Sequence, residues 1–236
     1  MPVKLVVFDM AGTTVTDKNF VATAFQNAFK NQDILISSEE INPLMGYEKK
    51  LAIQMMLEKH GIDPDNYLPA GRQGRDDNEM IDEIYHDFIE EMVDFYERSP
   101  EVKPAPGAEE LFQQLKERSI MVALNTGFPK NIADVIVHRF KWNEKGLIDD
   151  YIASDEVKKG RPHPFMIEQL MFRAGVDDPL MVAKVGDTAV DVEEGNNVGC
   201  SYNIAITTGA YKMAELENSG PTHIVNSLLE IPSIIM

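Results

Sequence analysis

Residues 3–14, VKLVVFDMAGTT, place Asp9 directly after a run of apolar side chains. A short continuous apolar run is typical of a strand buried on both faces, as in a parallel sheet. The polar, glycine-containing turn after Asp9 ends that strand. Because ligands of open α/β sheets bind at the carboxyl ends of the strands, we expect Asp9 to stand at a functional edge.

From residue 104 onward, short apolar runs alternate with amphipathic segments. We predict strands at 120–125, 151–154, 181–185, 202–206 and 223–225. The helices expected between them cover 108–118, 130–140, 164–174, 190–199 and 212–218. This βαβα rhythm predicts an α/β fold, with a Rossmann-like parallel sheet that carries helices on both faces.

Residues 17–99 have a different, helical pattern. One stripe of apolar side chains recurs at helical spacing, at Ile81, Ile84, Phe88, Met92 and Phe95. A segment rich in Gly, Pro, Asp and Asn at 61–78 predicts a loop within this block. We therefore expect an inserted all-helical cap domain at 17–99 and a catalytic core formed by 1–16 and 100–236.

Composition narrows the possible partners. The 236 residues contain 22 Lys+Arg against 39 Asp+Glu, a formal net charge of −17. This balance argues against nucleic acid or an anionic membrane as a partner, because both require a cationic face. A single cysteine, Cys200, excludes a disulfide framework, and no run approaches the roughly 20 apolar residues of a membrane helix. The first apolar run is too brief for a signal peptide, so we expect a cytoplasmic protein.

Acidic residues follow two of the strands, Asp9 after the first and Asp187 after the strand at 181–185, with Asp191 four residues further on. Each one alone is more often a turn former or a helix cap. Together they meet at one sheet edge, where two carboxylates repel unless a cation lies between them. The pattern therefore predicts Mg²⁺, and a carboxylate held beside Mg²⁺ is suited to attack phosphorus.

The remaining strand ends supply a hydroxyl and cations. Thr126 follows the strand at 120–125, and Lys159 and Arg161 lie in the loop after the strand at 151–154. These side chains, with backbone amides, can neutralise phosphoryl oxygens. A small anionic metabolite is thus the expected substrate.

In order and over the full chain length, these segments resemble the four motifs of the haloacid dehalogenase superfamily of hydrolases, and the helical insert resembles the cap of that superfamily. The resemblance implies that Asp9 is the nucleophile and forms an aspartyl-phosphate intermediate. It implies that Asp187 and the backbone carbonyl of Ala11 hold Mg²⁺ together with Asp9, and that Asp191 supports the site.

The same resemblance implies the phosphate-binding residues. Thr126 and Arg161 would hold the phosphoryl group, and we include the turn residues Gly12 and Thr13 along with Gly127 and Lys159 in that set.

Ala11 stands where most phosphatases of the superfamily carry a second aspartate, the general acid. Losing a positioned general acid costs about 10²- to 10⁴-fold in rate. The phosphonatase branch, which hydrolyses phosphonoacetaldehyde, has Ala there and uses a cap lysine that forms a Schiff base. The sequence resembles this branch in DMAGTTV (9–15), MGYEK (45–49), TGF (126–128), GRPHPFM (160–166) and KVGDT (184–188). The resemblance implies Lys49 as the Schiff-base lysine.

The chain departs from the branch at two positions. Ala52 replaces a proton-shuttling histidine three residues after the lysine, and Phe128 replaces a tyrosine. His60 would lie about 16 Å along the helix from Lys49, too far to substitute.

The sequence favours a phosphonatase-like hydrolase acting on phosphonoacetaldehyde or a related carbonyl phosphonate. Two alternatives stay open: a small-metabolite phosphomonoesterase of the phosphoglycolate phosphatase type, and a regulatory phosphate-binding protein with low turnover. A homodimer formed between caps would fit the resemblance.

Overall fold

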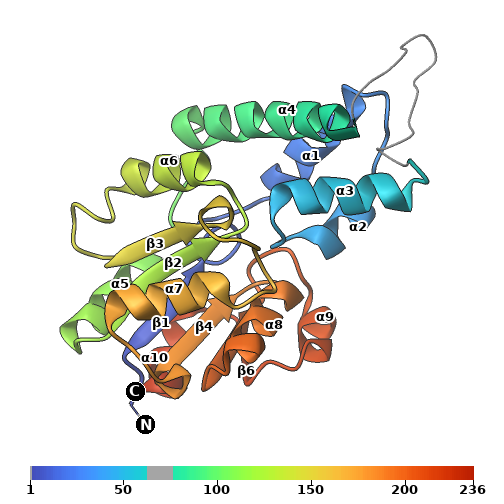
Figure 1. Cartoon of the computed structure of the whole chain (residues 1–236). Coiled ribbons are helices and arrows are strands. Elements are labelled where there is room, and N and C mark those ends of the chain that lie inside the picture. The colour runs from blue at the N-terminus through green and yellow to red at the C-terminus, as the bar shows by residue number, and fades with distance from the viewer. Residues whose placement is uncertain (1, 63–76) are drawn as a thin grey trace.

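The computed structural model describes residues 2–62 and 77–236, and the loop expected at 61–78 falls largely outside this part. The described strands form a single six-stranded parallel sheet in the order β3-β2-β1-β4-β5-β6 (Figure 1). Their bounds are β1 (Leu5–Asp9), β2 (Met121–Thr126), β3 (Asp150–Ala153), β4 (Val182–Gly186), β5 (Tyr202–Ile206) and β6 (His223–Val225). The strand order reverses between β1 and β4, which is where ligands of such sheets bind.

Helices cover both faces of the sheet, as the alternating pattern predicted. The core helices are α5 (Ala108–Glu117), α6 (Lys130–Phe140), α7 (Phe165–Ala174), α8 (Ala189–Val198), α9 (Met213–Asn218) and α10 (Pro232–Ile235). Short 3₁₀ turns are η2 (Ser154–Glu156), η3 (Pro179–Met181) and η4 (Leu228–Glu230). Alternate residues of β1 point to opposite faces. Val6 and Phe8 belong to the buried cluster that includes α5 and α6, whereas Leu5 and Val7 pack with α7.

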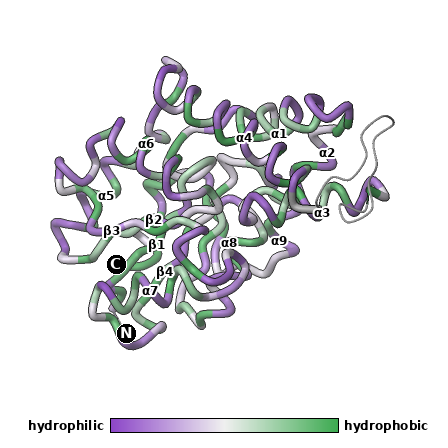
Figure 2. The backbone as a smooth tube through the Cα atoms, turned by 45° about the horizontal axis from the view of Figure 1, so that its top comes forward, coloured by the Kyte–Doolittle hydropathy of each residue, from purple (hydrophilic) through white to green (hydrophobic). Residues whose placement is uncertain are grey.

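Hydrophobic segments gather along the central strands and hydrophilic ones along the outer turns (Figure 2). Every residue of β1 and β4 is buried, which explains why continuous apolar runs marked these strands in the sequence. In the described part of the chain, none of the helices combines the length and apolarity needed to cross a membrane.

The described elements inserted after β1 are all helical. They are α1 (Phe20–Lys30), α2 (Ser38–Ile41), the 3₁₀ turn η1 (Asn42–Leu44), α3 (Lys49–Lys59) and α4 (Asp77–Arg98), grouped at one end of the sheet (Figure 1). Helix α2 was not predicted, although Ser37 and Glu40 form a capping box at its start.

The two chain crossings between the sheet and these helices lie side by side. Val15 pairs with Pro104, the Thr16 amide donates to the Lys103 carbonyl at 3.0 Å, and the Ala105 amide donates to the Thr14 carbonyl at 2.8 Å. The helical insert, called the cap below, is therefore attached through one short paired neck. The exact cap boundaries at 17 and 99 stay a prediction.

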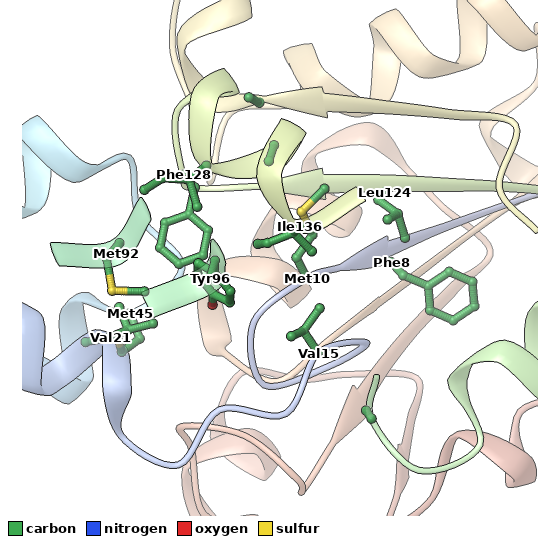
Figure 3. Close-up of a cluster of buried hydrophobic side chains, with 14 of the residues drawn as sticks. Phe8, Met10, Val15, Val21, Met45, Met92, Tyr96, Leu124, Phe128 and Ile136 are labelled. Atoms are coloured by element: carbon green, nitrogen blue, oxygen red, sulfur yellow. The ribbon is translucent and has the colours of Figure 1, made fainter. Parts of the chain in front are cut away.

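The cap packs on the core through a continuous buried apolar cluster (Figure 3). Tyr96 of α4 meets Phe128, which follows β2, edge to face with ring centroids 5.8 Å apart. At Gly127 the approach is so close that an added Cβ would lie 2.4 Å from the Tyr47 carbonyl oxygen of the cap. Only glycine permits this contact, so the structure shows the cap closed on the sheet edge.

The first prediction concerns the core that supports β1. Phe112 of α5 is fully buried against Phe8 and Trp142, whereas Phe172 of α7 is 81% exposed. We expect Phe112→Ala to lower the free energy of unfolding by about 3–5 kcal/mol through lost burial and a residual cavity. The matched control Phe172→Ala should change it by less than about 0.5 kcal/mol. Urea unfolding followed by Trp142 fluorescence measures both, and equal losses in the two variants would contradict this packing.

Candidate active site

Cap and sheet edge enclose a cavity of about 30 Å³. Its lining includes six of the residues singled out in the sequence: Asp9, Ala11, Lys49, Thr126, Gly127 and Asp187. They come from the ends of β1, β2 and β4 and from the start of α3. The strand ends and the cap thus bring a nucleophile candidate, metal-ligand candidates and an amine to one enclosed space.

Asp9 is held from behind by Arg161. The Arg161 Nη1 donates to Asp9 Oδ1 at 2.6 Å, and both side chains are buried. Burial raises the pKa of Asp9 to about 6, since desolvation and the nearby charge of Asp191 outweigh the stabilising charge of Arg161. The guanidinium therefore fixes Oδ1, one of the two carboxylate oxygens of Asp9.

All three nitrogens of Arg161 contact acceptors of the chain itself. Besides the Asp9 contact, Nη1 lies 2.9 Å from Asp191 Oδ1 and Nε donates to Glu194 Oε2 at 3.1 Å. The Nη2 group donates to the carbonyl oxygen and the Oδ1 of Asn125 at 2.7 and 2.6 Å. We expected Arg161 to hold the phosphoryl group directly. The structure instead keeps its guanidinium outside the cavity lining, where it orients Asp9.

A second buried cation completes this network. Lys184 of β4 lies 3.0 Å from Asp191 Oδ1 and 3.2 Å from Glu194 Oε2, and it donates to Asn125 Oδ1 at 2.6 Å. The pKa of Asp191, which burial alone would raise, is lowered below its ordinary value by the charges of Arg161 and Lys184. Two cations, Arg161 and Lys184, thus face three carboxylates, those of Asp9, Asp191 and Glu194.

Asp187 is fixed by neighbours that the sequence assigned to phosphate binding. The Thr13 hydroxyl donates to Asp187 Oδ1 at 3.0 Å, and the Ala210 amide donates to Oδ2 at 2.7 Å. Gly12, with a φ of +90°, packs so closely that an added Cβ would lie 2.5 Å from Asp187 Oδ2. Gly12 and Thr13 are therefore outside the cavity lining and position Asp187, which corrects their expected role.

The donor set fits Mg²⁺. Asp9 and Asp187, which carry carboxylates, and Ala11 border the same cavity, and oxygen is the ligand that Mg²⁺ prefers. Burial and the charge of Asp9 raise the pKa of Asp187 well above its ordinary value, and a cation bound between the two carboxylates would offset this effect. Among the described residues, no three His, Cys, Asp or Glu side chains form a metal cluster, and the Ala11 carbonyl stays a prediction as the third ligand from the chain.

Thr126 and Gly127 reach the cavity as expected, but Lys159 does not. Thr126 accepts a hydrogen bond from the Phe128 amide at 3.1 Å, which leaves its own hydroxyl proton to donate to a ligand. Lys159 is exposed and borders a separate hollow together with Glu48 and His163. The prediction that Lys159 joins the phosphate pocket is therefore not met in this structure.

Lys49 is buried, with only 3% of its surface exposed. Its Nζ donates to the Tyr47 carbonyl at 3.1 Å and lies 5.0 and 5.7 Å from the ring centroids of Phe128 and Phe25. Desolvation by burial lowers the pKa of Lys49 to about 8, although the charge of Asp9 acts in the opposite direction. A substantial share of this amine is thus neutral and nucleophilic slightly above neutral pH.

The proton shuttle of the phosphonatase branch has no direct substitute on α3. Ala52 is buried one turn beyond Lys49, and His60 follows the last residue of that helix. There His60 Nε2 pairs with Glu40 Oε1 at 3.1 Å. The structure confirms that His60 lies at the far end of α3 from Lys49.

Comparison with known proteins places this geometry in a family. Residues 6–205 match the sequence model of the haloacid dehalogenase-like hydrolases. The chain belongs to this family. The match runs from β1 to β5 and includes the whole cap, so Asp9, Lys49, Thr126 and Asp187 fall within it, whereas Ala210 follows it.

Among characterised relatives, the chain is similar to phosphonoacetaldehyde hydrolases. It is 26% identical to the enzyme of Bacillus cytotoxicus over 260 aligned residues, covering 100% of this chain and 96% of that protein. It is 30% identical to the enzyme of Hahella chejuensis over 208 aligned residues, covering 88% and 69%. The resemblance to the phosphonatase branch is thus confirmed at the level of sequence similarity.

Solved structures share the fold. A phosphonoacetaldehyde hydrolase-like protein from Oleispira antarctica has a TM-score of 0.84 at 23% identity, covering 100% of this chain and 92% of that one. A predicted phosphoglycolate phosphatase from Haemophilus somnus has a TM-score of 0.77 at 18% identity, covering 99% and 98%. The fold therefore occurs in proteins named for both of the enzymatic functions left open by the sequence.

Sequence reasoning missed three buried members of the site. Asn125, Lys184 and Glu194 complete the network around Arg161. A signal for Glu194 existed, because it lies three residues after Asp191 and so shares its helical face on α8.

The second prediction tests the metal site without activity. Mg²⁺ should raise the melting temperature at pH 8, by the equivalent of about 2.7 kcal/mol at 100 times Kd. The effect should shrink at pH 5, because Asp9 and Asp187, whose pKa values are raised, hold protons that compete with the metal. Differential scanning fluorimetry should show no shift in Asp187→Asn and a full shift in the exposed control Asp33→Asn. An equal shift in both variants would place the metal elsewhere.

Proposed function

We propose that the chain hydrolyses the carbon–phosphorus bond of a small 2-oxoalkyl phosphonate, with phosphonoacetaldehyde as the leading substrate. The observation that carries the proposal is the pairing of Lys49 and Asp9 on one closed cavity. A buried amine of lowered pKa suits attack on a carbonyl, and a carboxylate at the other side suits attack on phosphorus. The similarity to phosphonoacetaldehyde hydrolases supports this pairing.

Lys49 would first convert the carbonyl into an imine. Its nitrogen bonds to the carbonyl carbon, and the oxygen leaves as water. The protonated imine then accepts the electron pair of the breaking carbon–phosphorus bond, which becomes the double bond of an enamine. The aromatic rings of Phe25 and Phe128 keep the amine desolvated before the reaction and can stabilise the cation that forms.

Asp9 would accept the phosphoryl group. Its free oxygen attacks phosphorus while Arg161 holds the other oxygen, and the resulting aspartyl phosphate is hydrolysed by water. The Thr126 hydroxyl and the backbone at Gly127 would donate to the phosphoryl oxygens. Asp9, Asp187 and the Ala11 carbonyl would hold Mg²⁺, which when bound neutralises charge that builds up on those oxygens.

The reaction removes the need for the acid that Ala11 cannot supply. A phosphate ester releases an alkoxide, which requires protonation by a positioned group. An enamine carries no negative charge when it departs. Ala11 is therefore compatible with carbon–phosphorus cleavage and unfavourable for ester hydrolysis.

The cap has to move during turnover. A cavity of about 30 Å³ is far smaller than the roughly 300–1,000 Å³ of typical ligand pockets, and a phosphonate of several heavy atoms requires more room. Substrate entry thus needs the cap to swing away at its neck. Closing it again excludes water and strengthens the electrostatics around phosphorus.

A phosphomonoesterase of the phosphoglycolate phosphatase type is the second candidate. It is favoured by Ala52, which removes the proton shuttle that the imine route uses in the phosphonatase branch. This function needs no imine, so it makes the opposite prediction for Lys49.

The third prediction separates these two functions. Lys49→Arg keeps the positive charge but cannot form an imine. We expect the variant to lose phosphate release from phosphonoacetaldehyde by at least about 10²-fold and to lose the adduct trapped by borohydride. The neighbouring Lys50→Arg is the matched control, because Lys50 is exposed and pairs with Asp82 at 2.7 Å. Wild-type release of phosphate from monoesters that survives Lys49→Arg would support the phosphomonoesterase, and no turnover on either substrate class would support a binding protein.

The fourth prediction follows from the pKa of Lys49. Attack on an acylating reagent requires only the neutral amine, so the rate of Lys49 acetylation by acetic anhydride should rise with pH through about 8 and level off above it. An exposed lysine with an ordinary pKa would continue to gain reactivity up to pH 10. Peptide mass spectrometry of quenched samples at several pH values measures Lys49 and Lys50 side by side, and identical profiles would contradict the burial of Lys49.

A further inference from the structure

One ionisable residue of the cavity has no task in the reaction described above. The four ionisable residues that line the cavity in the described structure are Asp9, Asp17, Lys49 and Asp187. Asp9 would take the phosphoryl group, Asp187 the metal and Lys49 the carbonyl. Asp17 remains.

Asp17 is built into the neck where the chain passes from β1 to the cap. Its Oδ1 accepts a hydrogen bond from the Phe20 amide at 2.8 Å, at the start of α1. This bond fixes the carboxylate, and the residue borders the cavity. This hydrogen bond to the start of α1 requires only an acceptor, which asparagine or serine would also provide.

The reaction needs a proton donor, and neither Ala11 nor Ala52 can supply one. Forming the imine requires a proton for the departing hydroxyl, and releasing the product requires a proton on the enamine carbon. Ala11 and Ala52 carry only methyl groups, and His60 lies at the far end of α3. The donor must therefore come from another element that borders the cavity.

We propose that Asp17 is the acid–base catalyst for the carbonyl chemistry of Lys49. This inference rests on the proposed function and assigns to it a residue outside the motifs that carry the resemblance. It also explains how the chain can function with alanine at position 52.

The electrostatics around Asp17 support the assignment. Burial raises its pKa above the ordinary value, while the amides of Phe20 and Val21 and the charge of Lys49 act in the opposite direction. The titratable groups that interact with it are Lys49 of α3 and the buried Tyr96 of α4. A carboxyl group with a raised pKa holds its proton closer to neutral pH, as a general acid must.

The protons that Asp17 supplies are balanced by protons released later in the reaction. After Lys49 nitrogen bonds to the carbonyl carbon, Asp17 gives a proton to the hydroxyl, which leaves as water as the nitrogen lone pair forms the C=N bond. Asp17 regains a proton from solvent and donates it to the enamine carbon after the carbon–phosphorus bond has broken. Hydrolysis of the product imine and of the aspartyl phosphate each return one proton to water, which balances the two that Asp17 supplied.

The test uses the full-length chain and acetaldehyde with borohydride, which reports imine formation at Lys49 independently of phosphorus chemistry. Asp17→Asn keeps an oxygen that can accept the hydrogen bond from the Phe20 amide, but it removes the carboxyl group that would donate a proton. We expect it to slow adduct formation at pH 7 by about 10²- to 10⁴-fold and to reduce phosphate release in parallel. Asp17→Ser also keeps an acceptor for the Phe20 amide and has no carboxyl group, so it should show the same loss as Asp17→Asn. The exposed control Asp82→Asn should match wild type.

Slower adduct formation in Asp17→Asn indicates that Asp17 donates a proton, whereas faster formation indicates a purely electrostatic role. Its negative charge raises the pKa of Lys49, so a purely electrostatic Asp17 predicts faster adduct formation in Asp17→Asn, because more amine becomes neutral. An unchanged or faster rate in both Asp17 variants would overturn the inference while leaving the proposed function standing. A wild-type protein that neither forms the adduct nor cleaves phosphonoacetaldehyde would instead overturn the proposed function, and this inference with it.

Discussion

The contact between Arg161 and Asp9 is the constraint on which the rest of the site depends. A buried guanidinium with acceptors on all three nitrogens cannot shift without leaving charges unpaired, which makes its position rigid. Asp9 is thereby fixed where the strand order reverses, and Lys184 and Glu194 fix Arg161 in turn. The rigid edge of the sheet can then hold a reactive carboxylate at one geometry while the cap moves.

The cap adds what the sheet lacks. It supplies Lys49 in an aromatic, desolvated setting, and Lys49 and Asp9 border the same cavity in the structure closed at Gly127. Under the proposed function, the sheet edge would act on phosphorus and the cap on a carbonyl, and closure of the cap would join the two. The neck that permits closure also carries Asp17, so the hinge and the cavity share a residue.

The sequence was sufficient for the sheet and for the residues at the strand ends, because buried strands are continuous apolar runs and parallel strands end at one edge. Asp9, Thr126 and Asp187 were found in this way. The sequence could not show whether Lys159 or Arg161 lies in the site, because both are cations of one loop with only Gly160 between them. Only the fold decides which of the two is buried. Lys184 and Asn125 escaped notice because a polar residue inside an apolar strand gives no sign of its partners.

The most direct test of the account is the mass of the group that borohydride traps on Lys49 during reaction with phosphonoacetaldehyde. If Lys49 and Asp9 act on the same molecule, wild type should carry an ethyl group, from which phosphorus has departed. Asp9→Asn, which cannot accept the phosphoryl group, should carry an intact 2-phosphonoethyl group on the same lysine. Finding the same adduct in both proteins, or finding it on other lysines, would contradict a shared site.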